Sequence, residues 1–117
     1  LSQIIEVWQS TCEIYSNVTK PVYQATKKKP LVGEAVAEVL REAVSNAIKH
    51  GSANEIEIDA KVSNNLILLS ITNNGKPPVN SRGNGFGSKL YSELTHTWKL
   101  DKTEDGRTKF SATIFIA

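Results

Sequence analysis

The sequence predicts an α+β domain, a two-layer α/β sandwich in which about three helices cover one face of a mixed sheet of about five strands. Three observations predict it: a long amphipathic helix over residues 33–50 and two pairs of strands that read as hairpins, over 55–72 and 98–116. The 117 residues, of which 39% are apolar, are enough for one hydrophobic core and too few for two. We therefore expect a single domain over residues 1–117.

Charge and cysteine content exclude several classes of protein. The net charge is only +2 and the longest basic run, at residues 27–29, stands before a proline, so no nucleic-acid partner is indicated. The single cysteine, Cys12, excludes a disulfide framework or a cysteine-clustered zinc site and fits a reducing compartment. No apolar stretch reaches the length of a membrane span. Because of the reducing compartment, we expect a cytoplasmic domain. The start at Leu1 rather than Met indicates a piece of a longer protein, whose membrane anchor could lie outside this sequence.

The first thirty residues predict a helix, a strand and a loop. Residues 1–11 place apolar side chains at i, i+3, i+4 and i+7, which is the spacing of an amphipathic helix. Residues 12–18 read as a strand. Residues 19–30 contain two prolines and three successive lysines and therefore predict a loop.

The helix over 33–50 has one apolar and one polar face, with Gly51 where a C-terminal cap would lie. At about 100° per residue, Glu42, Asn46 and Lys49 fall within an arc of about 60° on the polar face. A carboxylate, an amide and an ammonium group therefore converge on one strip of this helix.

The second half of the chain alternates between strong elements and one long irregular segment. Residues 55–63 alternate strictly between apolar and polar side chains and predict a half-buried strand, which a short turn joins to a more apolar strand over 66–72. Residues 73–87 are rich in Gly, Pro and Asn and too long for a simple turn, so we expect them to be functional. A helix over 89–96 and a hairpin of strands over 98–103 and 107–116 close the chain.

Three segments, in this order, resemble the N, G1 and G2 boxes of the GHKL ATPase superfamily. They are residues 42–50 (EAVSNAIKH), 71–75 (ITNNG) and 83–87 (GNGFG). Residues 106–110 (GRTKF) are also similar to the Gly-x-Thr-x-Phe that opens the last strand in this family. The whole chain is most similar to the catalytic ATP-binding domain of bacterial sensor histidine kinases, and this resemblance implies the Bergerat-type ATP-binding fold.

The resemblance implies a role for each motif residue. Asn46 would ligate Mg²⁺ through its side-chain carbonyl, a hard oxygen donor suited to that ion. Glu42 would be the catalytic carboxylate that orients the attacking group. Lys49 would neutralise phosphate charge, His50 would border the ligand and Thr108 would lie near the adenine. The G2 glycines would form a mobile lid. All the residues that would bind the nucleotide, besides Asn46, are Lys49, His50, Asn73, Gly75, Gly83, Gly85, Gly87 and Thr108.

The implied activity is that of a Mg²⁺- and ATP-dependent histidine kinase. It would transfer the γ-phosphate of ATP to a histidine on a separate dimerisation domain of the same protein, a homodimer that acts on a response regulator. Neither His50 nor His96 has the charged neighbours expected of the phosphorylated histidine, which must lie outside this sequence. Two alternatives remain open: an anti-sigma-factor-type serine kinase of the same superfamily, and a degenerate domain that binds a partner protein and no nucleotide.

The G1 box departs from the family pattern at two positions. Asn73 stands where most relatives have the Asp that accepts a hydrogen bond from the adenine amino group, and Pro77 replaces the second Gly. A neutral acceptor is weaker than a charged one by about 1 kcal/mol. Because an Asn amide could turn over and offer either its carbonyl oxygen or its NH₂ group, we expect loose discrimination between purines.

Overall fold

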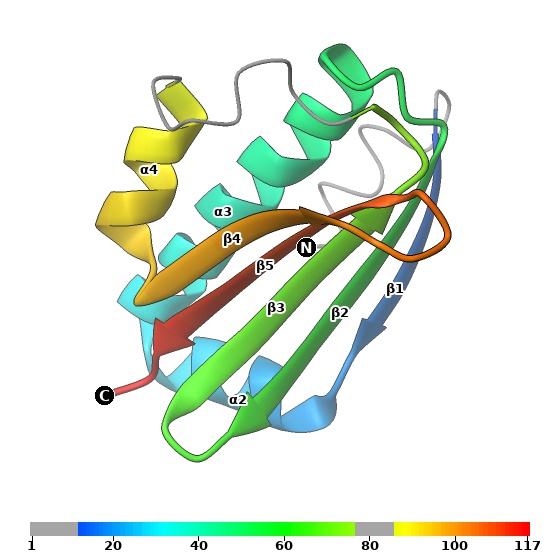
Figure 1. The fold of residues 1–117 in the computed structure, drawn as a ribbon. Coiled ribbons are helices and arrows are strands. Elements are labelled where there is room, and N and C mark those ends of the chain that lie inside the picture. The colour runs from blue at the N-terminus through cyan, green and yellow to red at the C-terminus, as the bar shows by residue number, and fades with distance from the viewer. Residues whose placement is uncertain (1–11, 77–85) are drawn as a thin grey trace.

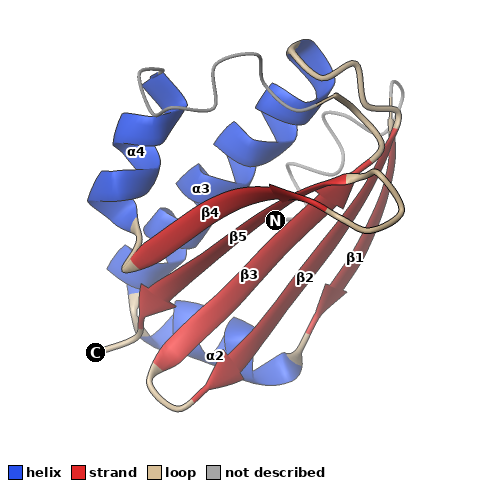
Figure 2. Cartoon of the chain, viewed as in Figure 1, coloured by secondary structure: helices blue, strands red, loops and turns tan. Residues whose placement is uncertain are grey.

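The computed structural model of the chain describes residues 12–76 and 86–117. In these residues five strands form one mixed sheet in the order β1-β2-β3-β5-β4, and three helices cover one of its faces (Figures 1 and 2). This arrangement confirms the predicted fold class. The helix expected over residues 1–11 lies outside the described residues.

Two antiparallel hairpins and one parallel pair build the sheet. β1 (Glu13–Val18) runs parallel to β2 (Glu55–Ser63), which pairs antiparallel with β3 (Leu66–Asn73). β5 (Thr108–Phe115) lies between β3 and β4 (Thr97–Lys102), antiparallel to both. Each strand is thus within about two residues of its prediction, because strict alternation specifies a half-buried strand.

The long helix α3 (Pro30–Lys49) begins earlier than the predicted residue 33. Pro30 occupies its first position, where a missing N–H costs nothing. Its apolar face lies against the sheet and is almost fully buried: Val36, Val39, Leu40, Ala43, Val44 and Ala47. The residue with positive φ after this helix is Ser52 (φ 56°) rather than Gly51, so Gly51 serves a purpose other than the expected cap.

The loop expected over residues 19–30 is wrong, because residues 20–28 form the helix α2 (Lys20–Lys28). Pro21 lies in its first turn and Pro30 opens the next helix, so both prolines start helices instead of breaking them. Val22 is 3% exposed and anchors α2 in the core. Basic side chains in its last turn match the negative end of the helix dipole.

The helix α4 (Phe86–Leu94) starts and ends a few residues before the predicted 89–96. It lies beside α3 on the same face of the sheet (Figure 1). Tyr91 buries its ring here, with ring centroids 4.4 Å from Phe110 and 5.2 Å from Trp98. None of the described helices combines the length and apolarity needed to cross a membrane.

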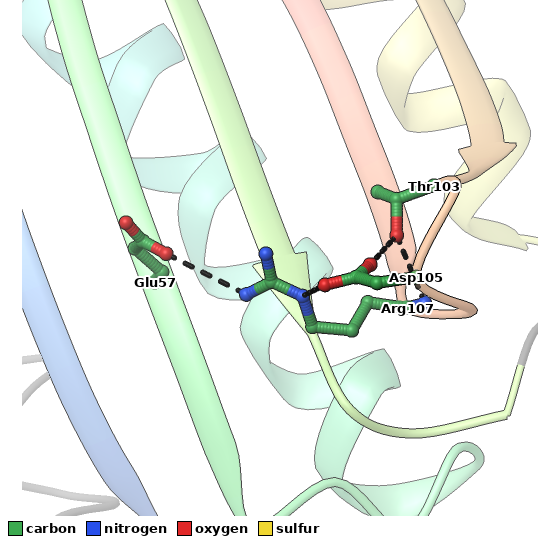
Figure 3. Close-up of polar contacts among 4 residues, drawn as sticks. All are labelled: Glu57, Thr103, Asp105 and Arg107. Carbon is green, nitrogen blue, oxygen red and sulfur yellow. Dashed lines mark hydrogen bonds and ion pairs between the residues drawn. The ribbon is translucent and has the colours of Figure 1, made fainter.

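A polar cluster holds the β4–β5 turn across the uncovered face of the sheet (Figure 3). Arg107 Nε donates to Asp105 Oδ2 at 2.9 Å, and Arg107 Nη1 lies 3.6 Å from Glu57 Oε2 on β2. Thr103 donates to Asp105, and its Oγ1 accepts the Arg107 backbone N–H at 2.9 Å. These groups are exposed, so they add little stability, but they fix the backbone immediately before Thr108.

A close contact between two glycines ties the end of α3 to the end of β3. The Lys76 N–H donates to the Gly51 carbonyl at 2.9 Å. A Cβ atom on Gly75 would lie 2.7 Å from the Gly51 oxygen, and one on Gly51 would lie 2.8 Å from the Ala47 oxygen. Both positions therefore require glycine for close backbone approach, which explains Gly51 better than a capping role does.

We expect Gly75→Ala to destabilise the protein by about 1–3 kcal/mol, because the new methyl group overlaps backbone that cannot move independently. Chemical denaturation measures the loss, and hydrogen exchange at the Lys76 amide should accelerate because its bond to Gly51 opens. Gly106→Ala is the control. Gly106 has a φ of 87° and open space around it, so this change strains a distant turn and should leave Lys76 exchange unchanged relative to global stability. An unchanged denaturation midpoint for Gly75→Ala would contradict the contact.

Candidate functional site

Most of the motif residues that the structure describes gather at one end of the sandwich, where α3 ends and β3 leaves the sheet (Figure 1). Asn46 lies in the last turn of α3, Asn73 is the last residue of β3, and Thr108 is the first residue of β5. Asn73 and Thr108 are register partners in the sheet. The end of the N-box helix thus meets the G1 box at the Gly51–Gly75 contact, whereas Gly83 and Gly85 of the G2 box lie outside the described residues. Gly87 is the second residue of α4.

The G1 box forms a connected polar cluster with β5. Asn73 Oδ1 accepts the Gly75 N–H at 2.8 Å, and Thr108 Oγ1 donates to the Gly75 carbonyl at 3.1 Å. Asn73 is 6% exposed and Thr108 is 3% exposed, so both are polar side chains held inside the fold. Burial of this kind is tolerated only with hydrogen-bond partners, and the Gly75 peptide supplies them.

This cluster fixes the orientation of the Asn73 amide. A backbone N–H can donate only to the carbonyl oxygen, so Oδ1 faces Gly75 and Nδ2 is directed elsewhere. Turning the amide over would set the NH₂ group against the Gly75 N–H, and a buried donor would lose its acceptor. The expected freedom of this amide to turn over is therefore restricted by a bond that sequence analysis did not foresee.

The predicted carboxylate and amide of α3 lie in contact. Asn46 Nδ2 donates to Glu42 Oε1 at 3.3 Å, one helical turn earlier, and both side chains are half-buried. The same Nδ2 lies 3.5 Å from the Tyr91 hydroxyl on α4. Burial raises the pKa of Tyr91, and the nearby Glu42 charge raises it further, so this hydroxyl stays protonated.

Tyr91 is the member of this site that sequence analysis missed. A tyrosine in an amphipathic helix reads as an ordinary core residue, and its partner is 45 positions away. Its hydroxyl could have indicated a polar contact from the sequence, because a buried Tyr O–H needs a polar partner.

Lys49 and His50 lie at the same end of α3 but stand apart from these contacts. Both residues are exposed, and among the described residues neither side chain has a hydrogen bond or an ion pair. His50 caps the helix through its backbone N–H, which donates to the Asn46 carbonyl at 2.9 Å. The ammonium group of Lys49 is therefore available to an anion.

The carbonyl oxygen of Asn46 fits a magnesium nucleotide. Both hydrogens of Asn46 Nδ2 are directed at Glu42 and Tyr91, and no described residue donates to Asn46 Oδ1. No described group of three or more His, Cys, Asp or Glu residues could hold a metal by itself. A hard cation at Asn46 would thus take most of its ligands from water and phosphate, as Mg²⁺ commonly does.

Comparisons by sequence and by structure differ in outcome. No family model matches the chain, and no curated protein sequence matches it. Solved structures do match. The histidine kinase AdeS of Acinetobacter baumannii superposes with a TM-score of 0.69 at 14% identity, over 98% of this chain and 62% of AdeS. This chain therefore spans less than two thirds of the AdeS chain.

Two separately solved domains match over most of their length. The catalytic domain of the histidine kinase ThkA gives a TM-score of 0.67 at 12% identity, over 97% of this chain and 88% of ThkA. The ATP-binding domain of PrrB from Mycobacterium tuberculosis gives 0.65 at 16% identity, over 97% of this chain and 88% of PrrB. The chain thus has the fold of the catalytic, ATP-binding domains of histidine kinases.

Proposed function

We propose that this chain is the catalytic domain of a two-component sensor histidine kinase, which binds Mg·ATP and transfers the γ-phosphate to a histidine on a separate dimerisation domain. The observation that carries the proposal is the Glu42–Asn46 pair, which presents an amide oxygen without a described partner on the helix whose end meets the Asn73–Gly75–Thr108 cluster at Gly51. The shared fold supports it, and the described residues of the N and G1 boxes lie where α3 and β3 end.

Each residue then has a task in phosphoryl transfer, which depends mainly on positioning and charge neutralisation. Asn46 would hold a magnesium ion, which when bound would offset phosphate charge. Glu42 orients the attacking group, and Lys49 adds positive charge near the phosphates. Asn73, Gly75 and Thr108 border the base, and His50 lies at the rim. The glycines at 83, 85 and 87 would cover the phosphates, as the resemblance implies. The partners are the dimerisation domain, in a homodimer, and a response regulator in the cytoplasm.

The degenerate alternative has one observation in its favour. Asn73 Oδ1 already accepts the Gly75 N–H, so only one of its two lone pairs is left for an adenine amino group. Titration with a non-hydrolysable ATP analogue separates this alternative from both kinases, since a pure interaction module would bind no nucleotide. The residue that receives the phosphate distinguishes the anti-sigma-factor-type serine kinase from the histidine kinase, because the serine kinase would phosphorylate a serine on a protein partner.

We expect Asn46→Ala to abolish Mg²⁺-dependent nucleotide binding and to leave the fold intact, because Asn46 lies on the half-buried polar side of α3. Calorimetric titration with and without Mg²⁺ measures the first effect, and thermal melting measures the second. Asn17→Ala, on exposed β1, is the matched control and should bind like the parent. Parental Mg·ATP affinity in Asn46→Ala, or a collapse of its melting temperature, would show that Asn46 is not the metal ligand.

Glu42→Gln should slow phosphoryl transfer by about 100-fold and change nucleotide affinity much less, because the amide keeps an acceptor for Asn46 but loses the orienting charge. The assay supplies the dimerisation domain of the same protein in trans with labelled ATP. Glu34→Gln, an exposed site earlier on α3, is the control.

The isolated domain, incubated with labelled ATP, should retain no acid-labile label. Such label on the isolated domain would refute the assignment of the phosphorylated histidine to another domain.

Asn73→Asp should tighten ATP by roughly 1 kcal/mol and weaken GTP by at least as much. One carboxylate oxygen would accept the Gly75 N–H, and the other would accept from adenine but face the guanine carbonyl. A competition assay between the two nucleotides measures the ratio, and Asn17→Asp carries the same charge change on exposed β1. An unchanged ratio would mean that residue 73 does not touch the base.

A further inference from the structure

An amide can ligate a hard cation only through its oxygen, so the orientation of the Asn46 side chain matters. Its NH₂ group has two hydrogens, and two acceptors lie within reach of them. Glu42 Oε1 is 3.3 Å from Nδ2, and the Tyr91 hydroxyl oxygen is 3.5 Å from it. When both hydrogens are engaged, Nδ2 is held by both partners and Oδ1 accepts a hydrogen bond from neither of them.

Glu42 and Tyr91 restrain the Asn46 amide in different ways. Glu42 lies on the same helix, one turn before Asn46, so it moves with α3. Tyr91 belongs to α4 and is held independently, with 7% of its surface exposed and its ring against Phe110 and Trp98. Two anchors on different helices restrict an amide more than one anchor on its own helix does.

The reverse orientation of the amide is unfavourable at this position. It would bring the Asn46 carbonyl oxygen against the Glu42 carboxylate, so two acceptors would meet without a hydrogen between them. The protonated Tyr91 hydroxyl can accept the second hydrogen of Nδ2 in the observed orientation. Its contribution is therefore directional, in addition to the packing of its ring.

We infer that Tyr91 is a positioning residue, whose hydroxyl acts with the Glu42 carboxylate to hold the Asn46 amide with its carbonyl oxygen available to Mg²⁺. The inference rests on the proposed function for the metal, whereas the orientation of the amide stands on the contacts alone. It assigns to α4 a polar role in the site, through a side chain outside the N, G1 and G2 boxes.

The test is Tyr91→Phe, which keeps the ring and removes only the hydroxyl. Affinity for a non-hydrolysable ATP analogue should fall about three- to tenfold with Mg²⁺ present, and stay within about twofold without it. In nitrogen-15 NMR of the protein without nucleotide, the Asn46 side-chain amide signals should shift and exchange faster with solvent. Tyr23→Phe removes a hydroxyl from a 54% exposed tyrosine on α2 and should change neither measurement.

Three results would overturn the inference. An equal loss of affinity with and without Mg²⁺ would mean that the hydroxyl supports only the structure. Unchanged affinity with Mg²⁺ would mean that Asn46 needs no second anchor. Unchanged Asn46 amide signals would mean that the hydroxyl does not hold this amide. Failure of the parent to bind the analogue refutes the proposed function instead, and the NMR signals then still decide whether Tyr91 orients Asn46.

Discussion

The packing of α3 against the sheet is the constraint on which the site depends. Val39 and Val44 are fully buried, and Leu40 is 1% exposed, so the rotation of this helix about its axis is fixed. A rotation by one residue, about 100°, would expose this face and bury Glu42 and Asn46. The core thus determines where the carboxylate and the amide face. Because α4 covers that side of α3, they are half-buried instead of fully solvated.

The position of α3 along its axis is determined by a different contact. Gly51 and Gly75 let two backbone segments meet, and the Lys76 N–H closes the junction on the Gly51 carbonyl. The Gly75 peptide is also the group that holds Asn73 and Thr108. One peptide therefore connects the helix end, the strand end and the start of β5. The bond to Gly75 also restricts Asn73, since it holds the amide in one orientation and uses one of the two lone pairs of Oδ1.

Sequence patterns predicted the sheet and α3 well because alternation and helical periodicity report burial, and burial decides these elements. They failed at α2, where two prolines and a lysine run read as a loop, although proline in a first turn starts a helix and Val22 anchors it. Within the site, one helical turn brought Glu42 and Asn46 together as predicted. The Tyr91 contact and the Gly51–Gly75 junction join residues remote in sequence, and periodicity carries no information on such partners.

Fold and chemistry are carried by different residues here, which is why the structural likeness persists at 12% and 16% identity. The fold needs apolar side chains at alternating and helical positions, and many sequences satisfy that pattern. The proposed chemistry needs particular atoms: an amide oxygen available at Asn46, and an acceptor or a donor at residue 73. A superposition of backbones is insensitive to either choice. Under the proposed function, the atoms that Asn46 and Asn73 offer to a nucleotide, held by Tyr91 and by Gly75, decide what this fold does in this protein.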